Sequence, residues 1–163
     1  MLKKAYQAIV DRLKEEVSQY YGERLVSLVI FGSVARGTQR FDSDIDFLLV
    51  VKGLPRGRTR RMAEFSKIEE KLSATLRDAE KKGLSVELSP VIKTPEETES
   101  GSHLFLDMVE DARIDYDREK FFANRMAKLR ARLADLGAKR RWQGNAWYWD
   151  LKPDYKPQDV FDL

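Results

Sequence analysis

The sequence predicts an α/β (α+β) domain, because long amphipathic segments alternate with short apolar, β-branched runs along its 163 residues. Residues 2–21 and 59–82 carry apolar side chains at the i, i+3, i+4 spacing of a helix that buries one face. Residues 25–31 and 45–51 are nearly unbroken apolar runs, which are typical of buried strands. A chain of this length can bury one substantial core, so we expect one domain over residues 1–137 followed by a tail.

The elements follow one another with recognisable ends. The first helix closes at Gly22, and the strand over residues 25–31 ends at Gly32. After the second strand, residues 53–55 read Gly-Leu-Pro and break the pattern. The rest of the domain is expected to contain a helix over 59–82, a strand over 84–91, a capped helical turn at 94–97, a helix over 103–111, a strand over 112–116 and a basic amphipathic helix over 117–136.

A glycine–serine turn at the end of the first strand is the first candidate binding feature. Gly32 and Ser33 stand where a strand turns into a helix, so their backbone can approach a ligand closely and offer N–H groups and a hydroxyl to phosphate oxygens. Residues 32–38 are also close to the G-x-x-x-x-G-K-[ST] loop of ATPases, but Thr38 and Gln39 occupy the positions of its lysine and hydroxyl residue. We therefore reject a P-loop ATPase. Taken alone, a turn of this composition is more often only a turn.

Two aspartates, Asp44 and Asp46, flank Ile45 where the second strand begins. Residues at i and i+2 of a strand point to the same face, so both carboxylates converge on one point and repel each other. A bound cation relieves this repulsion, and ligands that offer only oxygen suit Mg²⁺ or Mn²⁺. The chain has no Cys and one His, which argues against zinc. An isolated Asp-x-Asp is more often a solvated loop, but this one follows the glycine–serine turn and has strands on both sides.

Together, residues 32–38 (GSVARGT) and 43–46 (SDID) resemble the signature of the DNA polymerase beta-like nucleotidyltransferase superfamily, in its minimal branch. The resemblance implies a nucleotidyltransferase fold with a mixed β-sheet flanked by helices, a nucleoside triphosphate substrate, and Mg²⁺ or Mn²⁺. It also implies that Asp44 and Asp46 hold the metal and act in catalysis. The motif residues that it assigns to nucleotide binding are Gly32, Ser33, Arg36, Gly37 and Ser43.

Members of this superfamily also use a third carboxylate from a neighbouring strand, and Glu87 is our candidate for it. Glu87 lies within the strand-like residues 84–89. In a two-metal site with ions about 3.5–4 Å apart, one ion activates the attacking hydroxyl and the other stabilises the leaving group. On this scheme Glu87 is metal ligand and general base together. The family more often has Asp at this position, and the alternative is that Glu87 lies on the polar face of an edge strand.

Several other polar residues have two interpretations. A run of arginines before the second long helix could receive a polyanionic substrate or form a solvated helix entry; it comprises Arg56, Arg58, Arg60 and Arg61. The single histidine, His103, could contact nucleotide, or it could cap the next helix or lie in the core.

The tail, residues 138–163, contains all three tryptophans of the chain. Trp142, Trp147 and Trp149 occur among tyrosines and prolines and show no regular period. Large aromatic groups bury much area when they are covered. We therefore expect the tail to pack on its own domain, or to dock on a partner protein or a second copy of the chain.

Composition narrows the cellular context. The net charge of +3 is mildly basic, which suits a nucleotide substrate and leaves nucleic-acid binding open. No apolar run approaches the roughly 18 residues of a membrane span, no signal peptide is evident, and cysteine is absent. We expect a soluble, cytoplasmic protein with no membrane association.

The acceptor and the activity remain open between three functions. The first is an enzyme that moves a nucleoside monophosphate from a nucleoside triphosphate, with ATP as the expected donor, to a hydroxyl. The resemblance is greatest to the antitoxins of HEPN/MNT pairs, which implies a tyrosine of a HEPN-type toxin as acceptor. The second function is the same transfer to a small molecule such as an aminoglycoside. The third is a non-catalytic module that binds nucleotide or masks a partner. Intact Asp44 and Asp46 favour an enzyme, and the lack of an evident acceptor-binding domain favours a protein acceptor.

Overall fold

A four-stranded sheet forms the centre of the structure, a computed structural model that describes all residues 1–163. The strand order is β3-β2-β1-β4. β1 (Leu25–Phe31) pairs antiparallel with both β2 (Ile45–Val51) and β4 (Arg113–Asp117), whereas β2 and β3 (Leu88–Lys93) run parallel. The sheet is therefore mixed, as the resemblance implied.

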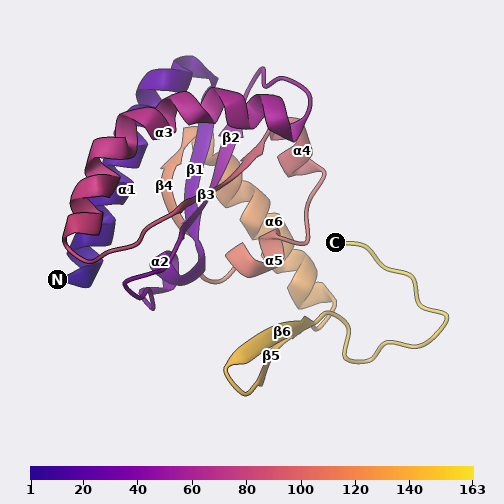
Figure 1. Cartoon of the computed structure of the whole chain (residues 1–163). Coiled ribbons are helices and arrows are strands. Elements are labelled where there is room, and N and C mark those ends of the chain that lie inside the picture. Colours follow the sequence, from indigo (N-terminus) through magenta and orange to yellow (C-terminus); the bar gives the residue numbers. More distant parts are fainter.

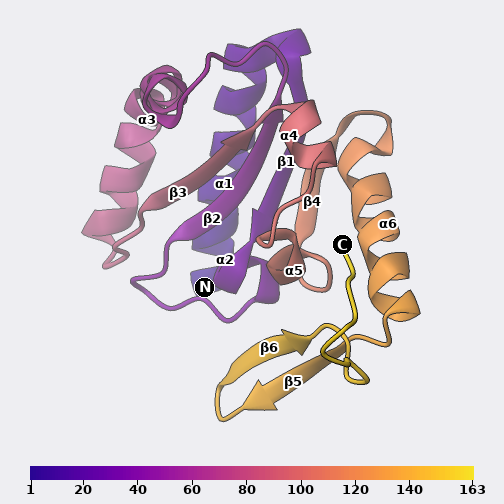
Figure 2. The same ribbon diagram turned by 90° about the vertical axis from the view of Figure 1, so that its right-hand side faces the viewer.

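Helices cover both faces of this sheet (Figures 1 and 2). They are α1 (Leu2–Tyr21), α2 (Gly32–Arg36), α3 (Arg58–Lys81), α4 (Pro95–Glu99), α5 (Phe105–Met108) and α6 (Phe121–Asp135), with single 3₁₀ turns at Gly22–Arg24 and Arg118–Lys120. α1 and α3 pack on one face, and α5 and α6 pack on the other. The predicted α/β (α+β) class is confirmed.

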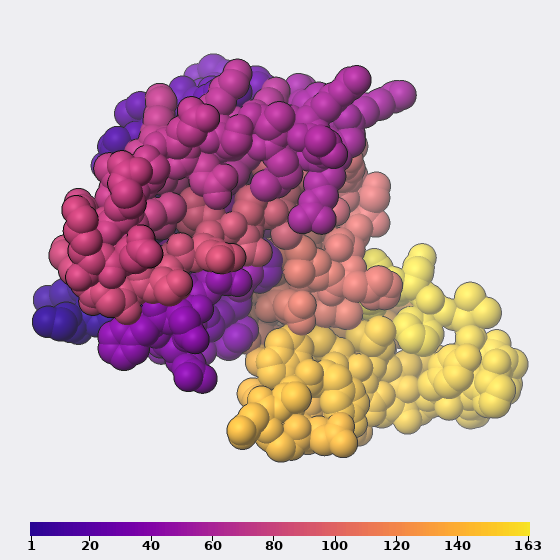
Figure 3. Space-filling model, viewed as in Figure 1, coloured from indigo at the N-terminus to yellow at the C-terminus, as the bar shows by residue number.

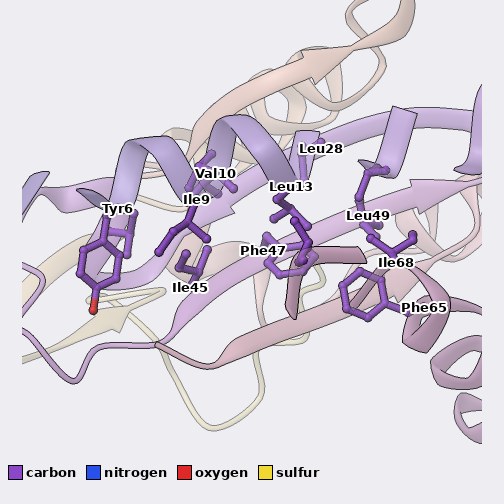
Figure 4. Close-up of a cluster of buried hydrophobic side chains, with 14 of the residues drawn as sticks. Tyr6, Ile9, Val10, Leu13, Leu28, Ile45, Phe47, Leu49, Phe65 and Ile68 are labelled. Carbon is purple, nitrogen blue, oxygen red and sulfur yellow. The ribbon is translucent and has the colours of Figure 1, made fainter. Parts of the chain in front are cut away.

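Each face of the sheet has its own apolar core. On one face, Tyr6 of α1 and Phe65 of α3 belong to the same buried cluster as Phe47 of β2 (Figure 4). On the other face, Leu48 of β2 is buried together with side chains of α5 and α6. Successive β2 residues thus alternate between two buried faces, which explains the unbroken apolar run. Asp46 is two residues before Leu48, so its side chain projects on the same face of the sheet, which α5 and α6 cover.

Several predicted bounds agree with the structure, whereas β3 and the last helix each begin four residues later than predicted. α1, β1 and β2 have the predicted bounds, and α3 is displaced by one residue. β3 begins at Leu88 instead of Leu84. Before it, the Ser85 N–H donates to the Phe41 carbonyl at 2.8 Å, and the Glu87 carbonyl accepts from the Ile45 N–H at 2.9 Å. These contacts fasten the segment to the loop before β2, and the regular ladder starts only at Leu88.

Capping hydrogen bonds of nearby side chains determine where two of the helices begin. The predicted turn at residues 94–97 is confirmed, because the Thr94 hydroxyl accepts from the Glu97 N–H at 3.2 Å and the Glu97 carboxylate accepts from the Thr94 N–H at 2.9 Å. The helix expected over 103–111 is reduced to α5. The last helix begins later than expected because the Asp117 carboxylate, still in β4, accepts from two N–H groups of its first turn at 2.9 Å each.

The tail contains regular structure even though its sequence shows no regular period. Its first part is a hairpin of β5 (Lys139–Gln143) and β6 (Ala146–Asp150), joined by the two-residue turn Gly144–Asn145. Gly144 has a φ of 62°, which glycine adopts without strain and which tight hairpin turns require. The hairpin and the final residues form the orange and yellow lobe at the lower right of the molecule (Figure 3).

The final residues after β6 have no regular structure and run back beside α6 (Figure 2). There the Arg132 side chain of α6 donates to the Asp162 carbonyl at 2.8 Å. None of the helices combines the length and apolarity needed to cross a bilayer.

Candidate active site

The glycine of the predicted turn and the second aspartate of the predicted pair touch each other. Phe31, the last residue of β1, lies opposite Asp46 in the antiparallel ladder, so the chain turns beside the Asp46 side chain. Gly32 has a φ of 71°, and a Cβ at this position would overlap the Asp46 Oδ2 atom. Both the backbone conformation and the lack of space require glycine here. The two halves of the sequence motif are thus one structural unit.

The turn itself is compact. α2 begins at Gly32 and ends at Arg36, and the next residue, Gly37, has a φ of 71° and caps the helix in the left-handed region. The Thr38 N–H donates to the Ser33 carbonyl at 2.9 Å, and buried Val34 anchors α2 in the core under α1. The first N–H groups of a helix have no partner within it. Those of the Gly32–Ser33 turn are therefore the groups that can receive phosphate oxygens.

Asp46 lies in an electrostatic environment that favours protonation. Partial burial raises its pKa, and the neighbouring Asp44 carboxylate raises the pKa further. The Ser89 hydroxyl on β3 and the Arg36 guanidinium lower it in part. The Asp44 carboxylate is thus close enough to act on the charge of Asp46, and Arg36 is the cation that opposes this effect.

The loop before β2 presents Asp44 and is held by α1. The Tyr6 hydroxyl lies 2.8 Å from the carbonyl oxygens of both Arg40 and Ser43. The Ser43 hydroxyl accepts from the Arg40 N–H at 2.8 Å. Ser43 therefore shapes the loop that carries Asp44, and a direct contact of its hydroxyl with nucleotide stays a prediction.

The donor set of the acidic pair fits a hard divalent cation. Asp44 and Asp46 offer only carboxylate oxygens, and Mg²⁺ or Mn²⁺ would offset the repulsion between their negative charges. The chain brings together no group of three or more Asp, Glu, His or Cys side chains at distances that would hold a metal ion. Glu87 is exposed and precedes β3, where Ser89 is the residue opposite Asp46. The role of Glu87 as third carboxylate thus stays a prediction.

A pocket of about 440 Å³ opens at Asp46. From the motif it is lined by Gly32, Arg36 and Asp46. The other side comes from residues that the sequence did not single out for this site: Asp107 of α5, and Asn145 and Trp147 of the hairpin. Gly144–Asn145 between two aromatic stretches is a hairpin signal that could have been recognised. Asp107 has no comparable local signal, because only the tertiary fold brings α5 to the turn.

The remaining sequence candidates lie elsewhere. Arg61 donates to both carboxylate oxygens of Glu97, at 2.7 and 3.0 Å, and to the Pro55 carbonyl at 2.9 Å, so it fastens the helix entry to α4. The arginine run follows the end of β2, whereas the acidic pair lies at its start. His103 is exposed and lines a different pocket beside α6.

One strand of the mixed sheet ends in a glycine–serine turn, and the Asp-x-Asp pair stands at the start of its antiparallel neighbour. Together these features define a nucleotidyl-transferring enzyme. The profile of the nucleotidyltransferase domain family matches residues 10–134. The chain belongs to this family and is a nucleotidyltransferase.

Two archaeal relatives carry a more specific name. One is the Methanocaldococcus jannaschii protein MJ1305, named as a protein adenylyltransferase, which is 29% identical over 124 residues covering 75% of this chain and 79% of the relative. A second protein from the same organism with the same type of name, MJ0141, is 36% identical over 47 residues, or 29% of this chain and 48% of the relative.

Solved structures with a similar trace are more distant. A toxin–antitoxin complex with AMP-PNP matches with a TM-score of 0.46 and 15% identity over 78% of this chain and 91% of the other. A nucleotidyltransferase from Sulfolobus solfataricus matches with a TM-score of 0.42 and 24% identity over 71% and 89% of the two chains.

Proposed function

We propose that this enzyme transfers AMP from ATP to a hydroxyl group of a protein, with Mg²⁺ held by Asp44 and Asp46. The observation that supports the proposal is the contact of Asp46 with Gly32, since the proposed metal ligand then lies directly against the turn proposed to bind phosphate. Residues 1–137 would form the catalytic domain, and residues 138–163 a segment packed on it. We expect the enzyme to act in the cytoplasm.

In this proposal each motif residue has a defined task. Backbone N–H groups at Gly32 and Ser33 bind the triphosphate, and the Arg36 guanidinium offsets its negative charge from the same pocket. Asp44 and Asp46 orient the cation, which when bound would polarise the α-phosphate and stabilise the pyrophosphate that leaves. The acceptor hydroxyl attacks the α-phosphorus, a bond to the acceptor oxygen forms, and the bond to pyrophosphate breaks. Glu87 is the proposed base for the hydroxyl proton.

The acceptor is proposed from chemistry and from relatives. A protein hydroxyl is supported by the relative named as a protein adenylyltransferase, which matches most of both chains. The minimal-branch resemblance favours a tyrosine of a HEPN-type toxin over other protein hydroxyls. Tyrosine also suits a transfer assisted by a general base, because its phenol loses a proton more readily than an aliphatic hydroxyl does.

The test uses ATP labelled at two different phosphates. The chain is incubated with Mg²⁺ and a HEPN-type protein as the proposed partner, and this protein is then separated and its label is counted. We expect label from the α-phosphate on a partner tyrosine and none from the γ-phosphate. Label from the γ-phosphate would show phosphoryl transfer and would contradict the proposal. Nucleotide binding without any label on the partner would favour the non-catalytic module.

A further inference from the structure

The three tryptophans of the chain share one face of the hairpin. Residues directly opposite each other in an antiparallel pair lie on the same face, and faces alternate along each strand. Arg140 pairs with Trp149, and Trp142 pairs with Trp147, so all four side chains lie on one face. Tyr148 lies on the other. The alternation gives the hairpin an aromatic face and a polar face.

The base of this aromatic face is fixed to α5. The Trp149 indole N–H donates to the Leu106 carbonyl at 2.9 Å, and Arg140 forms an ion pair with Asp111 at 3.0 Å. Trp149 is also packed against the apolar cluster under α5 and α6. Leu106 immediately precedes Asp107, which lines the pocket at the acidic pair. The hairpin is therefore fastened to the wall of the active-site pocket.

The tip of the face extends into that pocket. The Arg140 guanidinium carbon lies 4.0 Å from the centre of the Trp147 ring and 5.3 Å from the centre of the Trp142 ring. This contact restrains Trp147. Trp147 is partly buried and lines the pocket together with Gly32 and Asp46, whereas Trp142 is 64% exposed and does not line it. A restrained indole thus lies across the pocket from the phosphate-binding turn.

We propose that Trp147 stacks on the nucleobase of the triphosphate and that the Asn145 amide contacts the polar edge of the same base. This inference rests on the proposed function, because it needs the triphosphate to lie at the Gly32 turn. The two sides of the pocket differ in chemistry as the two ends of a nucleotide do. One side has a cation and a carboxylate, Arg36 and Asp46, and the other has an indole and a neutral amide next to the Asp107 carboxylate of α5. An indole beside an amide suits a flat heterocycle with donors and acceptors on its rim.

The position of the tryptophans provides a specific signal. Because all three lie in β5 and β6, intrinsic tryptophan fluorescence reports only on the hairpin. The chain is titrated with a non-hydrolysable ATP analogue and with inorganic triphosphate, each with Mg²⁺, and binding is also measured by calorimetry. We expect the analogue to quench the fluorescence and inorganic triphosphate to bind with little quenching, since it has no base.

Variants separate stacking from general damage. Trp147→Ala should weaken binding of the analogue about tenfold, within the range that stacking of one base contributes, and leave the affinity for inorganic triphosphate unchanged. Trp147→Phe keeps an aromatic face and should recover most of the affinity while losing the quench. Tyr148→Ala, next in sequence and on the opposite face, is the matched control and should bind both ligands as the parent does.

The outcomes are distinguishable. Unchanged affinity of Trp147→Ala for the analogue would overturn the inference, and so would an equal loss for both ligands, which would assign Trp147 a structural role. Equal effects of Trp147→Phe and Trp147→Ala with intact secondary structure would also overturn it. If the parent binds neither the analogue nor inorganic triphosphate, the proposed function itself fails, and this inference fails with it.

Discussion

Substitution of Gly32 by alanine tests whether the turn and the acidic pair are one unit. Gly32 has a φ of 71°, and a non-glycine residue in the left-handed region costs about 1–2 kcal/mol. The new Cβ would also overlap Asp46 Oδ2, so the Asp46 side chain must leave its rotamer, which costs about 0.5–1.5 kcal/mol more. We expect Gly32→Ala to lower the free energy of unfolding by about 1.5–3.5 kcal/mol in all.

The chain offers a matched control for the backbone cost. Gly137, after α6, has a φ of 67°, and a Cβ there would meet no atom within 4 Å. Gly137→Ala should lose only the conformational part, about 1–2 kcal/mol, and keep its activity. Urea unfolding followed by circular dichroism gives both free energies, and AMP transfer is measured below the unfolding range. Gly32→Ala should lose transfer, because the displaced Asp46 would no longer be positioned to hold the proposed metal ion.

The reasoning is refuted by either of two results. Gly32→Ala with the activity of the parent would show that the contact with Asp46 is not needed for the reaction. Equal stability losses in Gly32→Ala and Gly137→Ala would show that the overlap with Asp46 has no energetic consequence.

Three further predictions follow from individual side chains. Burial and Asp44 raise the folded-state pKa of Asp46 above its ordinary value of 3.8, so ionised Asp46 destabilises the fold. Asp46→Asn should therefore unfold at a higher urea concentration than the parent at neutral pH. This gain in stability should vanish as pH falls below about 3.8. Arg61 lowers the folded-state pKa of Glu97 below its ordinary value of 4.5, so ionised Glu97 stabilises the fold. Glu97→Gln should therefore be less stable than the parent at neutral pH. The difference between their urea midpoints should shrink as pH falls below 4.5. Ser33→Ala should weaken binding of the ATP analogue by about 1 kcal/mol in calorimetry, one hydrogen bond, and a loss beyond tenfold would mean that the hydroxyl has a larger role.

The parts of the fold that the sequence predicts are those with a local physical cause. The apolar run of β2 is buried on both faces of the sheet. The buried side chains of α1, from Tyr6 to Tyr21, recur at helical spacing, so the sequence pattern coincides with burial in both elements. Strand parity joined Asp44 and Asp46, and the resemblance of residues 32–38 and 43–46 to the family signature assigned Gly32 to the same site.

The missed parts depend on contacts between distant segments. Asp107 reaches the pocket only because α5 packs under the sheet, and its exposed position on a four-residue helix has no sequence pattern. The start of β3, and with it the position of Glu87, depends on the register with β2. Aromatic residues of the tail obscured the alternation of the hairpin, since nearly every position in residues 146–149 is apolar.

The central claim is that this chain transfers a nucleotide with the carboxylate that touches Gly32. The most direct measurement compares the parent, Asp46→Asn and Asp78→Asn for transfer of α-phosphate label from ATP to the proposed HEPN-type partner. Asp78 is an exposed aspartate of α3, paired only with Lys81, and provides the same change of charge away from the pocket. The account predicts parental transfer in Asp78→Asn and a loss of at least a hundredfold in Asp46→Asn, about 2.7 kcal/mol of transition-state stabilisation or more. Transfer by Asp46→Asn at the rate of the parent would contradict it.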